Sequence, residues 1–280
     1  MKYYYGKHAF LTGGSSGIGL ASAELLASNG YIVFAASRNP GGENRVFPGG
    51  GEIRPVTIDV RDPRSVRTAV ESVLKQADVG IVIHCAGLGI ACAGEDYPSD
   101  AVEGLMETNY NGVLRVNSYI IPHLRKRGKG LCVIIGSIAG VFPIPYQSHY
   151  CSSKAALDLY AGALRMELHD YGVNVSLIMP GDTNTGFTGA RRYEISEASP
   201  LYGDCIRAVR KMEKDELEGR PPVSVARAIL HISESKIPSA RKVIGFEYKL
   251  LVFLKRLLPG RCAEFILRKM YLPRQKKKMR

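Results

Sequence analysis

Short apolar runs alternate with longer amphipathic segments along most of the chain. Runs of strand length occupy residues 8–11, 31–36, 53–58, 80–84, 131–135 and 173–178. Most of these runs are continuously apolar instead of alternating with polar residues, so we expect strands buried on both faces in a parallel sheet.

Segments with helical spacing separate several of these strands. The first covers residues 17–29 and ends at an Asn-Gly pair, a common helix terminus. Asp62 and Pro63 provide an N-cap and a first-turn proline for a helix over about 63–77, and a longer helix is expected near 149–171. Strands alternating with helices predict an α/β fold, a doubly wound parallel sheet covered on both faces.

Two segments depart from this alternation. Residues 39–51 are too rich in glycine and proline to form a full crossover helix. Residues 182–222 form a long insertion that is polar at first and helix-like over about 204–218. Neither segment marks a second domain, so we predict one domain over residues 1–245, followed by an extension over 246–280.

The net charge of +12 is concentrated in that extension. Residues 249–280 contain eleven Lys and Arg and one Glu, a net +10, so the other 248 residues carry only +2. A nucleic-acid-binding protein would spread its basic residues over a folded face, so we expect no nucleic-acid partner.

The extension has the pattern of two short amphipathic helices. Residues 248–258 are mostly apolar, Pro259 and Gly260 interrupt them, and residues 263–272 resume the pattern before Pro273 and a basic terminus. Such helices suit the surface of an anionic membrane. Packing against the protein's own domain or a partner subunit explains the same pattern, and the sequence leaves both open.

Cysteine and hydropathy patterns narrow the class further. The six cysteines form no C-x-x-C pair and no metal-ligand spacing, which indicates reduced thiols and no metal site. The start of the chain lacks a signal-peptide pattern, and no apolar stretch reaches the ~20 residues of a spanning helix. We therefore expect a cytoplasmic protein that is either free or peripheral to a membrane.

A glycine-rich loop joins the first strand to the first helix. Glycines there allow a tight turn and a close backbone approach, and the helix N-terminus offers free N–H groups to a pyrophosphate. The loop lacks the G-K-[ST] ending of an ATP-binding P-loop, so a dinucleotide is the expected ligand. The residues expected around it are Gly13, Ser15, Ser16, Gly17, Ile18 and Gly19.

Residues at the ends of the next two strands bear on the choice of dinucleotide. A carboxylate after the second strand would hold a ribose 2′-hydroxyl, but Ser37 and Arg38 stand there. The arginine suits a 2′-phosphate, so we expect NADP(H) in preference to NAD(H), although a solvated arginine is the alternative. Asp59, followed by Val60, is placed either to bind the adenine amino group or to cap a turn.

A phenol and an ammonium group share one face of the helix near 149–171. Tyr150 and Lys154 are four residues apart. A free phenol has a pKa of about 10, and a nearby lysine cation would lower it towards neutral pH. Ser137 follows the fifth strand, where its hydroxyl can hold a substrate oxygen, and Asn109 is placed to anchor a water near Lys154.

Together, these motifs resemble the short-chain dehydrogenase/reductase family over roughly residues 7–245. The resemblance implies a Rossmann-type domain that interconverts an alcohol and a ketone, and a homodimer or homotetramer. It implies Tyr150 as general acid/base, Lys154 as ribose ligand, Ser137 as carbonyl orienter and Asn109 as a proton-relay member. The further cofactor contacts that it implies are Tyr150, Lys154, Ala86, Gly87, Pro180, Gly181, Thr183 and Thr185. One departure is Cys85, where the family has asparagine, which questions local stability more than chemistry.

The insertion matches the family's variable substrate lid, over about 186–220. Phe187, Tyr193 and Tyr202 offer aromatic surface to a lipophilic steroid-, retinoid- or long-chain-lipid-like ketone, alongside Ser137 and Tyr150. Within the family, similarity to hydroxysteroid dehydrogenases and ketosphinganine reductases favours such substrates, reduced rather than oxidised. The alternatives are a 3-oxoacyl-thioester reductase and a catalytically idle nucleotide-binding scaffold at a membrane.

Overall fold

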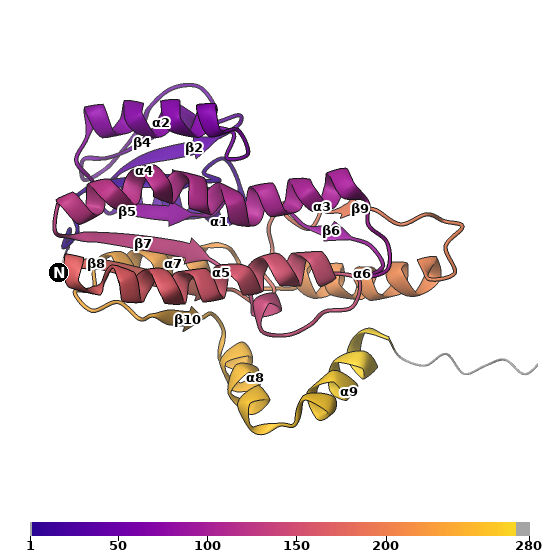
Figure 1. The fold of residues 1–280 in the computed structure, drawn as a ribbon. Coiled ribbons are helices and arrows are strands. Elements are labelled where there is room, and N and C mark those ends of the chain that lie inside the picture. Colours follow the sequence, from indigo (N-terminus) through magenta and orange to yellow (C-terminus); the bar gives the residue numbers. More distant parts are fainter. Residues whose placement is uncertain (1, 273–280) are drawn as a thin grey trace, which may run out of the picture.

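A central sheet of parallel strands organises the protein in a computed structural model that describes residues 2–272 (Figure 1). The eight strands lie in the order β10-β8-β7-β5-β1-β2-β4-β3, and only β3 pairs antiparallel to its neighbour. The strands are β1 (His8–Thr12), β2 (Ile32–Ser37), β3 (Arg45–Phe47), β4 (Gly51–Thr57), β5 (Val79–His84), β7 (Gly130–Ile135), β8 (Val173–Met179) and β10 (Arg241–Val243).

The direction of strand addition reverses beside β1. The chain adds β2 and β4 on one side of β1, then returns to add β5, β7, β8 and β10 on the other. In open α/β sheets, ligands bind at the carboxyl ends of the strands where this reversal occurs. The topology therefore places a binding site beyond the ends of β1 and β5.

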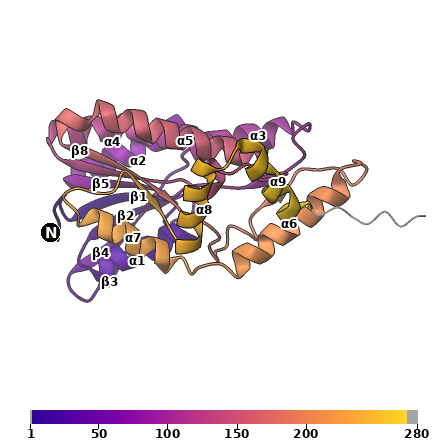
Figure 2. The same cartoon turned by 90° about the horizontal axis from the view of Figure 1, so that it is seen from below.

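Helices cover both faces of the sheet, which confirms the predicted doubly wound α/β fold (Figures 1 and 2). One face packs against α2 (Pro63–Gln76), α4 (Gly112–Lys126) and α5 (Ser148–Glu167). The other packs against α1 (Gly17–Ser28) and α7 (Val223–Ser233). Asp62 caps α2 as predicted, because its carboxylate accepts a hydrogen bond of 2.9 Å from Arg64 N.

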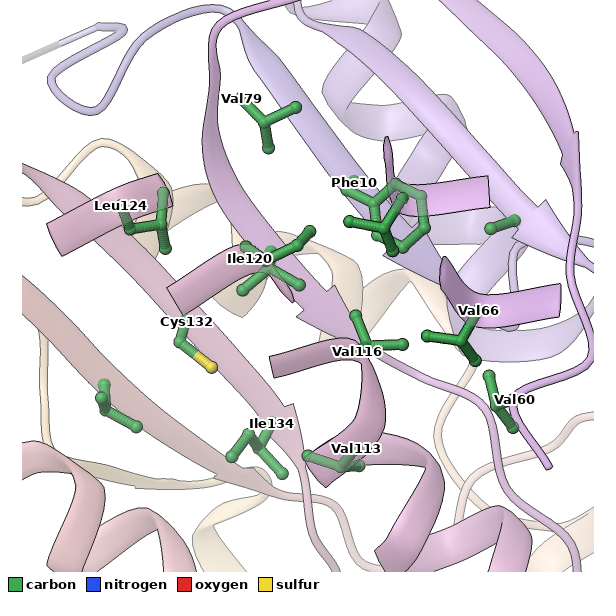
Figure 3. Close-up of a cluster of buried hydrophobic side chains, with 14 of the residues drawn as sticks. Phe10, Val60, Val66, Val79, Val113, Val116, Ile120, Leu124, Cys132 and Ile134 are labelled. Carbon is green, nitrogen blue, oxygen red and sulfur yellow. The ribbon is translucent and has the colours of Figure 1, made fainter. Parts of the chain in front are cut away.

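The core between sheet and helices is apolar on both faces. Figure 3 shows one part of it, where Phe10 of β1 and Ile134 of β7 face Val116 and Ile120 of α4. These four side chains are at most 1% exposed. The continuous apolar strands of the sequence are explained by this burial on both sides.

The glycine- and proline-rich segment after β2 forms a hairpin instead of a helix. There β3 returns antiparallel to β4 and extends the sheet edge. The long insertion contains β9 (Arg192–Tyr193), which pairs with β6 (Ile90–Ala91), and then α6 (Tyr202–Leu217). Sequence reasoning did not identify β10, whose three residues are too short to show a pattern. The remaining helices of the body are α3 (Ser99–Met106) and three short turns over 107–111, 138–140 and 169–171.

The extension forms two helices, α8 (Phe246–Leu257) and α9 (Gly260–Tyr271), separated at Pro259. They lie outside the helical layers, below the rest of the protein in the view of Figure 1, and they are inclined to each other (Figures 1 and 2). Over residues 2–272, no helix is both long and apolar enough to cross a bilayer. The basic terminus at 273–280, part of the predicted membrane-facing segment, lies outside the described residues.

Candidate active site

A cleft of about 590 Å³ opens at the carboxyl ends of the strands, where the topology predicts a site. Its lining brings together residues that are far apart in the sequence. Those predicted to contact a cofactor and found on its walls are Gly13, Ser15, Ser16, Gly17, Ile18, Gly19, Ser37, Arg38, Asp59, Val60, Ala86, Gly87, Tyr150, Lys154, Pro180, Gly181, Thr183 and Thr185.

The glycine-rich loop is shaped so that side chains do not fit at two positions. A Cβ atom on Gly19 would lie 2.0 Å from the carbonyl oxygen of Gly13. Gly13 itself has φ of +75°, and a Cβ there would lie 2.6 Å from the nitrogen of Ala86. Ser16 begins α1 without a capping hydrogen bond from its side chain, so the first N–H groups of the helix remain available to an anion. This cradle fits the pyrophosphate of a dinucleotide.

Cationic and polar side chains line the far end of the cleft. Ser37 is buried and Arg38 is exposed beside it. Asp59 forms an ion pair of 2.6 Å with Arg61, and hydrogen bonds from that guanidinium lower the pKa of the Asp59 carboxyl. Sequence reasoning missed Arg61, which also lines the cleft. The end of the cleft that the sequence predicts to hold the adenosine thus offers two arginines, one of them paired with Asp59.

Tyr150 and Lys154 lie together on α5, deep in the cleft. The ammonium nitrogen of Lys154 lies 5.7 Å from the centre of the Tyr150 ring and donates a hydrogen bond of 3.0 Å to the Ile135 carbonyl oxygen. Burial lowers the pKa of Lys154 to about 8. Burial also raises the pKa of Tyr150 above its ordinary value, although a hydrogen bond with Ser137 opposes the increase. The prediction that the pKa of Tyr150 is lowered is therefore wrong. Desolvation of the phenol raises its pKa by more than the nearby charges and the Ser137 hydrogen bond lower it.

Of the two other predicted catalytic residues, Ser137 lines the cleft and Asn109 does not. Ser137 follows β7 and lines the cleft, where its hydroxyl oxygen accepts a hydrogen bond of 3.1 Å from Ala139 N. Asn109 is fully buried within a π-helical turn and does not line the cleft. Its amide accepts from Leu88 N at 2.8 Å and donates to Leu88 O at 3.0 Å and to Ser153 Oγ at 3.1 Å. Asn109 thus fixes the loop after β5 against α5.

The loop after β8 closes the cleft opposite the glycine-rich loop. A Cβ on Gly17 would lie 3.3 Å from Cβ of Thr185, so the two loops are in near contact. Thr183 donates a hydrogen bond of 3.0 Å to Gly181 O, which tightens the turn. Cys85 packs beneath the glycine-rich loop, and burial raises the pKa of its thiol to about 12. At neutral pH this thiol is neutral and acts as a small apolar group.

Only some of the residues predicted to contact the substrate line the cleft. Ser137, Tyr150 and Phe187 line it, and the rings of Phe187 and Tyr150 have centroids 5.8 Å apart. Tyr193 and Tyr202 are not among the lining residues. The hydroxyl of Tyr193 instead donates a hydrogen bond of 2.6 Å to Glu213, because β9 turns this side chain towards α6.

A buried ion pair lies beside Phe187 in the insertion that the sequence predicts to be a substrate lid. The side chain of Arg191 is 1% exposed and pairs with Glu216 at 2.5 Å and with Glu213 at 3.4 Å. Its guanidinium lies 5.8 Å from the centre of the Phe187 ring. Arg191 is therefore occupied by protein carboxylates rather than free to bind an acidic substrate.

Sequence reasoning also missed Tyr271, at the end of α9. This residue of the extension lines the same cleft as Tyr150. It packs against a buried apolar cluster that includes Met212, and Ile144 and Tyr146 pack against the same cluster. Its helical stripe could be read from the sequence, since Ala263 and Leu267 precede it at intervals of four, but the surface that this stripe contacts could not.

The short chain dehydrogenase family matches residues 7–195 of this chain. The chain belongs to the short-chain dehydrogenase family. It is therefore an oxidoreductase of a family that acts on CH–OH groups with nicotinamide cofactors, in agreement with the resemblance read from its motifs.

Named relatives match this chain over nearly its full length or over a large part of it. The chain is 36% identical to a 3-ketodihydrosphingosine reductase of Bacteroides thetaiotaomicron over 93% of this chain and 96% of that protein. It is 33% identical to human 17-beta-hydroxysteroid dehydrogenase type 1, over 63% of this chain and 57% of that protein. A short-chain dehydrogenase structure from Streptomyces avermitilis superposes with a TM-score of 0.76 at 25% identity, covering 94% of this chain and 96% of that one.

Proposed function

We propose that this protein is an NADP(H)-dependent oxidoreductase that reduces a ketone on a lipophilic substrate. One observation carries the proposal: Tyr150, Ser137 and Lys154 share a single cleft with the glycine-rich loop. A phenol, a hydroxyl and a buried ammonium group thus meet beside a dinucleotide cradle. A catalytically idle scaffold would have no need of this arrangement.

The roles of the side chains follow from their environment. When bound, the nicotinamide supplies the hydride. Tyr150 gives its proton to the carbonyl oxygen, for which the phenol must be protonated, and at neutral pH it is. The Ser137 hydroxyl donates a hydrogen bond to the same oxygen and orients it. Lys154 lies beneath the phenol, where its ammonium group binds a ribose hydroxyl and stabilises the phenolate after the proton leaves.

The preference for NADP(H) rests on Ser37 and Arg38 at the end of β2, with Arg61 nearby on the same wall of the cleft. An exposed guanidinium next to an uncharged serine suits a 2′-phosphate and leaves no carboxylate to repel it. Arg38→Asp should weaken NADPH binding far more than NADH binding in fluorescence titrations. Equal losses for both cofactors would remove Arg38 from this role.

A long-chain ketone is the substrate class that we favour. The relative with 36% identity is named a 3-ketodihydrosphingosine reductase. In this chain the substrate end of the cleft carries apolar side chains from three segments, Phe187, Met212 and Ile144. The second candidate is a 3-oxoacyl thioester, because a ketoacyl reductase of Nostoc is 27% identical over 83% of this chain and 85% of that protein.

Steady-state turnover with NADPH on a panel of steroid ketones, long-chain ketones and 3-oxoacyl thioesters tests the proposal. We expect long-chain ketones to be reduced with the highest kcat/KM. Tyr150→Phe should abolish turnover and leave the Kd for NADPH nearly unchanged, because the phenol is needed only for proton transfer. Turnover that survives in Tyr150→Phe would contradict the assignment.

We also propose that the extension attaches the enzyme to an anionic membrane surface. The outward faces of α8 and α9 expose large apolar side chains, which are Phe246, Leu250, Leu251, Phe253, Leu254, Leu257, Phe265, Ile266 and Met270. Cationic residues share these helices, including Lys249, Arg256 and Arg268. Apolar surface flanked by cations matches the boundary between lipid headgroups and acyl chains.

Co-sedimentation with vesicles tests this attachment. We expect binding to phosphatidylglycerol-containing vesicles that weakens as salt is added, and little binding to phosphatidylcholine alone. Phe253→Glu should reduce binding, whereas Ile237→Glu, at a position 86% exposed outside the extension, should not. A full-length protein that ignores anionic vesicles would leave a partner subunit as the occupant of this surface.

The proposed assembly is a homodimer or homotetramer. The outer face of α5 exposes Leu159 and Met166, which are 75% and 76% exposed. Apolar side chains at this position suit contact with a second copy of the helix. Sedimentation velocity should show a dimer or tetramer that Leu159→Glu dissociates; a monomer at all concentrations would contradict this.

A further inference from the structure

The last turn of α9 returns to the body at the active-site cleft. Tyr271 lines this cleft together with Tyr150 and Phe187, although α9 has no fully buried residue. Tyr271 packs against the buried apolar cluster of Ala91, Cys205, Val209 and Met212, and so do Ile144 and Tyr146 of the loop that precedes α5. The extension is therefore part of the wall of the cleft and not only an appendage.

The extension contacts the body at three places along its length. At the start of α8, Tyr248 and Glu247 bind Asp182 and Arg220. Further along α8, Lys255 turns inward and donates a hydrogen bond to the carbonyl oxygen of Val141. Tyr271 provides the third contact, at the end of α9. The extension thus crosses the substrate side of the molecule from the loop after β8 to α6.

The surroundings of Tyr271 are apolar, in contrast to the end of the cleft that carries arginines. The adenosine end of the cleft carries Arg38 and Arg61, whereas Tyr271 is grouped with apolar side chains. On the outward side of the same helix, Phe265 and Ile266 are 57% and 48% exposed. An apolar chain that passes from the outer surface of α9 towards Tyr150 would meet the Tyr271 ring on its way.

We propose that Tyr271 contacts the apolar chain of the substrate and determines which chain lengths the enzyme accepts. The inference rests on the proposed reduction of a lipophilic ketone. The ring adds to the apolar wall beyond the reacting carbonyl, so its contribution grows with the length of the chain. A short ketone ends before it reaches Tyr271 and does not depend on it.

Kinetics on a homologous series of methyl ketones, with NADPH saturating, tests the first consequence. Tyr271→Ala should lower kcat/KM for the longest ketones by about tenfold, the amount expected from losing most of one aromatic contact. The same variant should leave kcat/KM for the shortest ketones and the Kd for NADPH unchanged. Tyr271→Phe should match the wild type, because the ring and not the hydroxyl makes the contact. A uniform loss across the series, or none, overturns the proposal.

A binding measurement that needs no turnover keeps this inference separable from the proposed reaction. The chain has no tryptophan, so Tyr271→Trp introduces a single tryptophan at the cleft wall, whose emission can be excited selectively over that of the tyrosines. Adding a long-chain secondary alcohol should shift its emission, and a short-chain alcohol should not. The control is Tyr171→Trp, because Tyr171 is 49% exposed and precedes the amino end of β8. An equal emission shift at both positions, or no shift in Tyr271→Trp, would overturn the proposed contact. A shift confined to Tyr271→Trp in a protein that shows no turnover would overturn the proposed reaction but not the contact.

Discussion

The hydroxyl of Tyr248 donates a hydrogen bond of 2.5 Å to Oδ2 of Asp182 and accepts one of 3.1 Å from the backbone nitrogen of the same residue. The Tyr248 ring also lies against Gly181, where an added Cβ would come within 2.2 Å of it. The first turn of α8 is thereby fastened to the loop that closes the cofactor end of the cleft. We therefore expect order in that loop to depend on the extension.

Tyr248→Phe should loosen the loop while keeping the ring in place. Burial raises the pKa of Asp182, and the Tyr248 hydrogen bond opposes this, so removing the hydroxyl leaves a partly buried carboxylate poorly solvated. We expect the free energy of unfolding to fall by about 1–3 kcal/mol and the Kd for NADPH to rise. Urea denaturation and fluorescence titration measure the two effects.

Tyr3→Phe is the matched control for that variant. The Tyr3 hydroxyl donates a hydrogen bond of 3.0 Å to Asn29 O, at the end of α1 away from the cleft. This variant should lose stability without any change in the Kd for NADPH. If both variants leave that Kd unchanged, Tyr248 does not order the cofactor loop.

Gly19→Ala should abolish cofactor binding through backbone displacement. The new Cβ would lie 2.0 Å from Gly13 O, so the loop must shift before any ligand binds. Gly104→Ala on α3 adds the same methyl group where nothing beyond the neighbouring helix backbone lies within 4 Å, and it should stabilise the protein by up to about 1 kcal/mol. Isothermal titration with NADPH and thermal unfolding compare the two. A Gly19→Ala protein that binds NADPH normally would show that the tight turn is not required.

Much of the fold could be predicted because its causes are local. The apolar run that became β7 and the Asp62 cap of α2 each show a pattern that the structure keeps. The grouping of Ser137, Tyr150 and Lys154 beside the glycine loop came from spacing and family resemblance. What could not be predicted depends on tertiary contacts. The placement of Tyr271 requires knowing how α9 returns to α6, and the inward turn of Lys255 requires knowing where Val141 lies.

The state of Tyr150 also depended on tertiary structure. The spacing of Tyr150 and Lys154 placed an ammonium group near a phenol, but it gave no measure of burial. In the structure, desolvation raises the pKa of the phenol and lowers that of the ammonium group. Burial depth decides which effect prevails, and only the packed fold determines that depth.

Breaking the buried ion pair of the lid should strongly destabilise the protein. Arg191→Met leaves Glu216 without its cation, and losing one partner of a buried pair costs about 3–5 kcal/mol. Arg192→Met is the neighbouring control, because the Arg192 side chain is 60% exposed where it pairs with Glu194, and its loss should cost at most about 1 kcal/mol. Chemical denaturation measures both. Equal free energies of unfolding for Arg191→Met and Arg192→Met would contradict the buried character of the Arg191 pair. Adding Glu216→Gln to Arg191→Met should recover part of the lost stability, because it removes the unpaired carboxylate.

The buried ammonium group of Lys154 should make stability depend on alkaline pH. A lysine has an ordinary pKa of 10.5, and burial lowers that of Lys154 to about 8. Between these values the unfolded chain holds a proton that the folded chain has released. The free energy of unfolding should therefore rise with pH across this window, by up to about 3 kcal/mol from this group, and the penalty should be fully present below pH 8.

Lys154→Met removes this contribution. Relative to the wild type, the variant should be more stable near neutral pH, and its advantage should shrink as the pH rises from about 8 towards 10.5, where the wild-type lysine becomes neutral in both states. Urea denaturation at several pH values in this window measures the difference. Lys126→Met, at an exposed position of α4, controls for the loss of one charge. A constant difference between Lys154→Met and the wild type would show that Lys154 keeps the same protonation in the folded and unfolded chains.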